Sequence, residues 1–263
     1  LILILLILSV SCEGDNPIVI TEPVKKSVSD YCALGASTAT MSWQKEVAKN
    51  LNTQEYTNYA IGGTRWAHTA ISAYDLSVNA SDNAHNKIMT NQLARLLKDK
   101  EDFGYNPEII TIMCGLNDAA NGSRIIGNFE HTNSFELTKI SPKDWITVVR
   151  FKNIRETVYG STRYFLEQLI FHFPNSKIII INLQQVDNGT YNNENASNIN
   201  AVLEHLSIFY ECYYIDVFNE SGITITSNIP SPFHRPDRLH PNAEGERLLT
   251  ILVTRKLKEY LNF

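Results

Sequence analysis

Residues 177–183 read KIIIINL, in which four isoleucines follow one another without a polar residue between them. A strand with one solvated face alternates apolar and polar side chains, whereas a strand covered by helices on both faces is apolar throughout. The run therefore predicts a strand of a parallel sheet that lies between two layers of helices. Parallel strands are joined by crossover helices, so strands and helices should alternate along the rest of the chain.

Four other short apolar runs predict strands, at residues 31–34, 56–61, 108–114 and 212–217. Between the strands, apolar residues recur at near-helical spacing, and we interpret each such stripe as the core-facing side of a helix. The recurring residues are Trp43, Val47, Ala48 and Leu51; Ile88, Leu93, Leu96 and Leu97; Tyr164, Phe165, Leu169 and Ile170; and Leu248, Leu249, Leu252 and Leu257. The third helix is expected to be interrupted near Gly160. The alternation predicts an α/β fold around five mostly parallel strands.

The composition fits one large domain. The chain has 263 residues, of which 43% are hydrophobic, and no repeat or change of composition divides residues 30–263. The formal net charge is −5 and no basic patch is present, so nucleic acid is not an expected partner. No CxxC or Cys/His cluster indicates structural zinc, and we expect neither metal nor cofactor. We expect Cys32, Cys114 and Cys212 to be buried thiols, although export would permit one disulfide.

The start of the sequence indicates export. The run LILILLILSVS is too short to span a bilayer but has the length of the apolar part of a signal peptide, so we interpret residues 1–11 as the remnant of one. Residues 9–12, SVSC, resemble a bacterial lipobox in which serine replaces the usual leucine. We therefore expect a lipid anchor at Cys12, a tether over residues 12–29 and a periplasmic or cell-surface location. The alternative is an ordinary secretory signal followed by a chance cysteine.

Two polar segments interrupt the periodic pattern. Residues 121–143 show little periodicity and predict a surface insertion that could border a site. Residues 187–200 are rich in asparagine, which raises calcium as an alternative, but they lack the D-x-[DN]-x-[DN]-G spacing and a suitably placed bidentate glutamate. We therefore expect a solvated loop that runs into a helix.

Ligands bind at the carboxyl ends of the strands in an open parallel sheet, because loops and helix N-termini converge there. The first three predicted strands are followed by GAST (35–38), GGT (62–64) and GLND (115–118), which are glycine-containing turns whose N–H groups can approach a substrate closely. The segment DRLHP (237–241) precedes the last helix, and its proline can lie in the first helical turn. Six residues before the histidine of this segment lies His234, its nearest competitor.

These four segments hold the groups that acyl transfer by a serine requires. A serine hydroxyl needs an imidazole within hydrogen-bond reach and a third group that fixes the tautomer of the imidazole. Ser37, His240 and Asp237 can fill these roles. Asp237 and His240 are three residues apart, so the carboxylate and the imidazole can meet on one turn. The N–H groups of Ser37 and Gly63 and the side-chain amide of Asn117 are available as donors to the oxyanion.

The same four segments resemble the sequence blocks of the SGNH (GDSL-like) hydrolase superfamily of esterases and lipases, over about residues 30–263. Ala36 departs from the pattern, because the family usually has aspartate there, but that aspartate is not the acid of the triad. In order, the blocks are LGAST (34–38), NYAIGGT (58–64), GLND (115–118) and DRLHP (237–241), the last of which continues as NAEG.

The resemblance implies a three-layer α/β/α sandwich with a five-stranded parallel sheet in the flavodoxin-like arrangement. It implies Ser37 as the nucleophile, with Asp237 and His240 as its partners. It also implies an oxyanion hole formed by Ser37, Gly63 and Asn117. The elbow of an α/β-hydrolase is a poorer match, because here the serine follows the first strand and the acid is three residues from the histidine.

The resemblance implies a serine esterase that acts on a small acyl ester and most of all on O-acetyl groups of carbohydrates, and the apolar start of the sequence adds the expectation that this esterase is exported. Arg65, Trp66, Asn121 and Arg124 lie near the block ends and are candidates to line the substrate pocket. Two alternatives are an acyltransferase that uses the same triad and a glycan-binding lipoprotein without activity, which Ala36 would mark. The expected partners are an acylated small molecule or polysaccharide and, through the lipid, a membrane.

Overall fold

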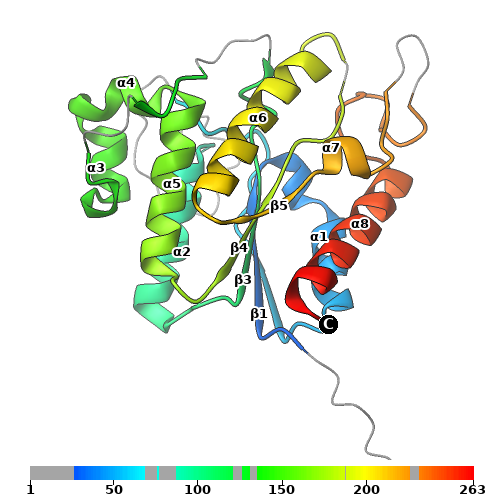
Figure 1. Cartoon of the computed structure of the whole chain (residues 1–263), viewed down its shortest axis with the longest axis horizontal. Helices are drawn as coiled ribbons and strands as arrows, with labels where there is room; N and C mark the ends of the chain where they lie inside the picture. Colours follow the sequence, from blue (N-terminus) through cyan, green and yellow to red (C-terminus); the bar gives the residue numbers. More distant parts are fainter. Residues whose placement is uncertain are drawn as a thin grey trace, which may run out of the picture.

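A computed structural model describes residues 27–68, 76, 87–120, 126–130, 135–186, 188–225 and 231–263. They form a sheet of five parallel strands in the order β2-β1-β3-β4-β5 (Figure 1). This flavodoxin-like order confirms the expected fold class. The signal-peptide remnant, Cys12 and most of the tether lie outside the described residues. All five predicted strands are present, as β1 (Asp30–Gly35), β2 (Glu55–Asn58), β3 (Ile109–Met113), β4 (Lys177–Ile181) and β5 (Tyr213–Ile215).

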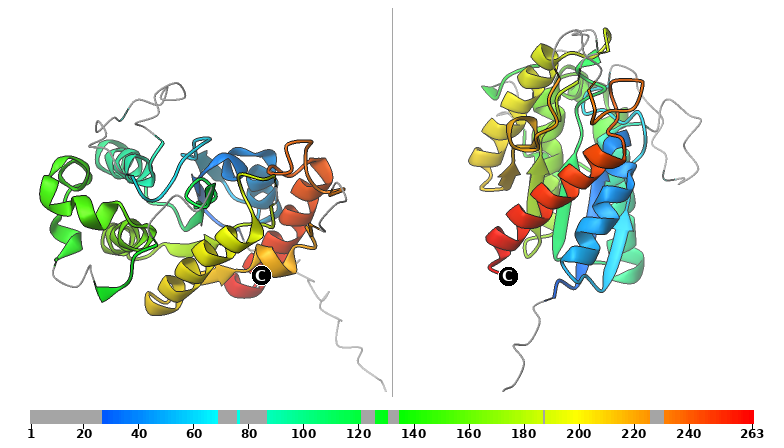
Figure 2. Two further views of the ribbon diagram at one scale, coloured as in Figure 1. Left: turned by 90° about the horizontal axis from the view of Figure 1, so that it is seen from above. Right: turned by 90° about the vertical axis from the view of Figure 1, so that its right-hand side faces the viewer.

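Helices cover both faces of the sheet (Figures 1 and 2). The helices α1 (Ser42–Asn50) and α8 (Ala243–Leu261) pack together on one face, and α2 (Met89–Phe103), α5 (Val158–His172) and α6 (Asn193–Phe209) cover the other. The shorter elements are the 3-10 helices η1 (Ser37–Thr40), η6 (Leu137–Lys139) and η7 (Val149–Phe151) and the helices α3 (Pro142–Thr147), α4 (Lys152–Arg155) and α7 (Val217–Glu220).

The isoleucine run of β4 supplies both hydrophobic cores. Ile178 and Ile180 belong to the core under α2, α5 and α6, whereas Ile179 and Ile181 belong to the core under α1 and α8. Successive side chains of a strand point to opposite faces, so four consecutive apolar residues place two on each side. In the order β2-β1-β3-β4-β5, the chain adds β2 on one side of β1 and the later strands on the other side. The loops that follow β1 and β3 therefore leave in opposite directions and open a crevice at the carboxyl ends of these strands.

The break in the third predicted helix lies before Gly160 rather than at it. The side chain of Thr157 accepts a hydrogen bond from the Gly160 N–H and caps α5, so the glycine belongs to the first turn of an unbroken helix. A Cβ atom at Gly160 would lie 2.4 Å from the carbonyl oxygen of Ile154 in α4. The glycine is therefore required by the close approach of α4 and α5. The expected interruption near Gly160 is present as the break between Arg155, which ends α4, and Val158, which begins α5.

The described part of the expected surface insertion is packed against the core. Leu137 is fully buried and Ile140 nearly so, and the side chain of Gln168 in α5 donates to both of their carbonyl oxygens. Residues 135–143 are thus anchored on α5, because a short polar segment with two well-placed apolar residues can cover a helix without showing periodicity. Residues 121–125 and 131–134 lie outside the described ranges.

The asparagine-rich segment behaves as expected, since the side chain of Asn192 caps α6 by accepting from the Asn195 N–H. Within the described residues, no three His, Cys, Asp or Glu side chains gather as a metal site would need. Cys32 and Cys114 are buried free thiols, and Cys212 is a half-buried one. Among the described helices, none combines the length and the apolar character that a membrane span requires.

Candidate active site

Ser37 lies at the carboxyl end of β1, where the sheet opens. Gly35 ends the strand with φ +143°, and a Cβ atom there would lie 2.1 Å from the carbonyl oxygen of Met113 at the end of β3. The Ala36 N–H donates to the same carbonyl oxygen at 3.0 Å. The chain therefore crosses directly above the switch point between β1 and β3 before η1 begins at the serine.

The buried side chain of Gln92 in α2 holds this turn by hydrogen bonds to the backbone of Gly35. Its Oε1 accepts from the Gly35 N–H, and its Nε2 donates to the Gly35 carbonyl, both at 2.8 Å. The same Nε2 lies 3.1 Å from the hydroxyl of Thr64 in the turn after β2. Gln92 thus joins the nucleophile turn to the second glycine turn, and the sequence pattern offered no signal for it because it lies within an apolar helical stripe.

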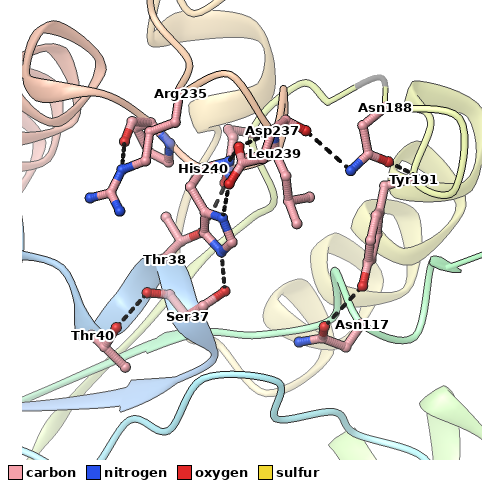
Figure 3. A network of polar contacts seen from close by, with 12 residues as sticks. Ser37, Thr38, Thr40, Asn117, Asn188, Tyr191, Arg235, Asp237, Leu239 and His240 are labelled. Atoms are coloured by element: carbon pink, nitrogen blue, oxygen red, sulfur yellow. Dashed lines mark hydrogen bonds and ion pairs between the residues drawn. The ribbon is translucent and has the colours of Figure 1, made fainter.

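The structure brings the three expected triad residues together (Figure 3). The Nε2 of His240 lies 2.7 Å from the Oγ of Ser37, and its Nδ1 lies 2.7 Å from the Oδ2 of Asp237. With the proton on Nδ1, the imidazole donates to the carboxylate, and Nε2 can accept from the serine hydroxyl. This is the tautomer that a general base beside a serine requires.

Asp237 is held in a tight turn that also fixes its charge. Its Oδ1 accepts from the backbone N–H groups of Leu239 and His240, both at 2.9 Å, and Arg238 between them adopts φ +53°. Partial burial raises the pKa of the carboxyl, but the hydrogen bonds from the imidazole and the two N–H groups outweigh it and lower the pKa of Asp237 to about 2. The carboxylate is therefore ionised at any pH at which the imidazole could act as a base.

The expected oxyanion donors lie on the two neighbouring turns. The Nδ2 of Asn117 donates one hydrogen to the Thr64 carbonyl at 2.8 Å, which leaves its second hydrogen for a substrate oxygen. A Cβ atom at Gly62 would lie 3.8 Å from the Cβ of Ser37, so the second glycine turn passes beside the nucleophile. Gly63 follows with φ +81°, a conformation that favours glycine.

This arrangement agrees with the comparison with protein families. The model of the GDSL-like Lipase/Acylhydrolase family matches residues 26–248. The chain belongs to this family. It is a hydrolase of the SGNH type, whose fold the five-stranded sheet reproduces. No curated protein matches the chain.

Solved structures show the same fold at low sequence identity. A lipase/acylhydrolase from Enterococcus faecalis is 16% identical with a TM-score of 0.54, and the match covers 88% of this chain and 96% of that one. A protein from Lactobacillus plantarum is 16% identical with a TM-score of 0.59, over 90% and 97% of the two chains. A GDSL-like lipase from Bacteroides thetaiotaomicron is 15% identical with a TM-score of 0.50, over 92% and 93%.

In this acylhydrolase His234, the alternative to His240 as the general base, has a structural role. His234 is 6% exposed, its Nε2 lies 2.9 Å from the Gln185 carbonyl oxygen, and its Nδ1 lies 2.8 Å from the Ser231 hydroxyl. Burial lowers the pKa of His234 and favours the neutral ring. One ring nitrogen therefore attaches the loop before α8 to the segment after β4, and the other bonds to a serine of the same loop.

The four candidate pocket residues of the acylhydrolase have different places. Trp66 is 1% exposed, its indole N–H donates to the Cys114 carbonyl at 3.0 Å, and its ring meets Phe165 edge-on. It is therefore part of the core and does not line an open pocket, which corrects that expectation. Arg65 is half-buried beside the second glycine turn. Asn121 and Arg124 lie outside the described residues.

A buried glutamine that the sequence blocks do not include joins the two halves of the acylhydrolase site. The Nε2 of Gln184, just after β4, lies 3.3 Å from the Thr38 hydroxyl and 3.1 Å from the Leu239 carbonyl oxygen. Thr38 follows the nucleophile and Leu239 precedes the general base. Gln184 therefore fixes the separation of the two elements that supply them.

Proposed function

We propose that this acylhydrolase is an exported serine esterase that removes small acyl groups, most of all O-acetyl groups of carbohydrates. The observation that carries the proposal is the continuous hydrogen-bonded chain from Asp237 through His240 to Ser37, beside the side-chain amide of Asn117. A serine, an imidazole and a carboxylate in this order, next to preorganised donors, are the parts that ester hydrolysis needs.

Each group has a defined task in the proposed reaction. The Oγ of Ser37 forms a bond to the ester carbonyl carbon while its proton moves to the Nε2 of His240. The carboxylate of Asp237 stabilises the imidazolium, and the oxyanion accepts hydrogen bonds from the Asn117 amide and from the N–H groups of Ser37 and Gly63. The imidazolium then returns its proton to the leaving alcohol, and water releases the acyl group by the same route.

The exposure of the triad supports an ester carried on a large molecule. The side chains of His240 and Asp237 are 24% and 43% exposed, so the reacting groups lie at the surface of the domain. An acetyl group that projects from a polysaccharide can reach such a site without the polymer entering a deep cavity. In addition, β1 begins at Asp30 and Ser37 follows its carboxyl end, so an anchor that precedes residue 27 would join the domain through the opposite end of this strand from the site.

Hydrolysis of an aryl acetate and of acetylated polysaccharides tests the proposed activity. Replacement Ser37→Ala should lower kcat on the order of 10⁴-fold or more, because the nucleophile is lost. Ser176→Ala is a matched control, since that hydroxyl donates to the Pro107 carbonyl at the opposite end of the sheet. Equal rates for wild type and Ser37→Ala would exclude the mechanism, and faster hydrolysis of long acyl esters than of acetyl esters would exclude the proposed substrate class.

Metabolic labelling tests the proposed anchor. Cells that produce the protein are grown with labelled fatty acid. The label should be incorporated into the wild-type protein and into the Cys212→Ser variant, but not into the Cys12→Ser variant. A secreted, unlabelled wild type would instead support an ordinary signal peptide and exclude the lipid anchor.

A further inference from the structure

The loop between β4 and α6 contacts the oxyanion residue directly (Figure 3). The hydroxyl of Tyr191 donates to the Oδ1 of Asn117 at 3.3 Å, while the Nδ2 of the same amide donates to the Thr64 carbonyl at 2.8 Å. Both ends of the amide therefore have a protein partner. The Thr64 carbonyl can only accept, so it sets which end of the amide carries the hydrogens, and the tyrosine fixes the other end.

Tyr191 is itself held by a turn that touches the proton-transfer loop. The Oδ1 of Asn188 accepts from the Tyr191 N–H at 2.9 Å, and the Asn188 N–H donates to the Tyr191 carbonyl at 3.0 Å. The Nδ2 of Asn188 donates to the backbone carbonyl of Asp237 at 3.2 Å. The short turn from Asn188 to Tyr191 thus contacts the triad acid Asp237 through Asn188 and the oxyanion amide of Asn117 through Tyr191.

We infer that Tyr191 is a positioning residue that orients and polarises the Asn117 amide for the oxyanion. This inference rests on the proposed function, because it assigns a task within the same site. A hydrogen bond to the carbonyl end of an amide strengthens its N–H groups as donors, since linked hydrogen bonds polarise one another. The gain is largest when the negative charge on the substrate oxygen is fully developed, so it stabilises the transition state more than the bound ester.

The distinguishing feature of this role is a change in kcat that depends on Asn117. Tyr191→Phe removes the hydroxyl and keeps the ring, so kcat should fall about 3- to 10-fold with KM nearly unchanged, as expected for one neutral hydrogen bond. In an Asn117→Ala background the same replacement should change kcat by less than about 2-fold, because the amide on which the hydroxyl acts is absent.

Steady-state kinetics of the wild type, the two single variants and the double variant on an aryl acetate test the inference. Tyr210→Phe is the matched control, because its hydroxyl bonds to Glu167 and lies among α5 and α6 side chains, and it should leave kcat unchanged. Thermal unfolding of each variant verifies that the fold is retained.

Three outcomes would overturn the role of Tyr191: an unchanged kcat in Tyr191→Phe, an equal loss in the presence and absence of Asn117, or a rise in KM alone. The second would show that the hydroxyl acts on the substrate independently, and the third that it contributes only uniform binding. Failure of the proposed function gives a different result, since Ser37→Ala would then hydrolyse the ester as fast as the wild type.

Discussion

The turn after β1 and the loop before α8 each supply part of the triad, but the fold holds them in different ways. The turn is held mainly against the sheet, because the Ala36 N–H donates to the Met113 carbonyl and only glycine fits at position 35 beside that carbonyl. The Gln92 side chain adds two further bonds to Gly35. The loop over residues 231–242 lies outside the sheet and is held by backbone bonds within the loop and by side chains, such as that of Asn242, which donates to the Pro232 and His234 carbonyls. The position of the nucleophile therefore follows from the global fold, and that of the imidazole from a local polar network.

The largest expected effect is a loss of activity on replacing Asp237 in the loop, a change that should leave the fold intact. Asp237→Asn keeps an oxygen for the Leu239 and His240 N–H groups, but its amide nitrogen would donate to the imidazole and move the ring proton to Nε2. That nitrogen could no longer accept from Ser37, so kcat should fall by about 10⁴-fold. Kinetics on an aryl acetate measure the loss, and a melting temperature close to that of the wild type would support the contrast between the two regions. A kcat within tenfold of the wild type would contradict it.

The corresponding change in the turn should act on stability. Gly35→Ala combines a φ of +143° with a contact of 2.1 Å to backbone, and we expect the free energy of unfolding to fall by about 2 to 5 kcal/mol. Gly104→Ala is the control, because that glycine caps α2 at φ +71° with nothing within 4 Å of the added atom, and it should cost about 1 kcal/mol. Urea unfolding compares the two. Equal losses would mean that the turn is no more constrained than an exposed helix end.

The sequence predicted those parts of the site whose geometry is local. A three-residue spacing is enough to place Asp237 against His240, and the glycines mark turns whose backbone must come close to a neighbour. Gln92 and Gln184 were missed because their partners are distant in the sequence, and a single polar residue in the apolar stripe of a helix or after a strand has no periodicity to reveal it. The side chain of Trp66 follows a block of the motif, yet proximity along the chain does not decide whether a side chain points to the core or to the crevice.

Replacing the glutamine that connects the two regions should produce an intermediate effect. Gln184→Leu keeps the volume of a buried side chain and removes its bonds to Thr38 and Leu239, which leaves the carbonyl of Leu239 without this donor. We expect kcat to fall about 10-fold and the free energy of unfolding to fall by about 1 to 3 kcal/mol. If kcat falls while the free energy of unfolding stays unchanged, Gln184 acts mainly by aligning the triad. Unchanged kinetics would show that the turn and the loop are positioned independently of each other.

The smallest effect concerns pH and separates the loop from the sheet-bound turn. Burial lowers the pKa of His234 below its ordinary value of 6.5, so the folded protein binds fewer protons than the unfolded chain between the lowered pKa and pH 6.5. The free energy of unfolding should therefore rise with pH across this window and decrease as the solution is acidified below about pH 6.5. Asp237 does not contribute there, because its lowered pKa of about 2 makes its stabilising effect disappear only below about pH 4.

Melting temperatures between pH 7.5 and 5.5 should thus fall more in the wild type than in His234→Gln, whose amide can still donate to the Gln185 carbonyl but does not titrate. Identical pH dependence in the two proteins would mean that the attachment of the loop does not depend on the neutral ring.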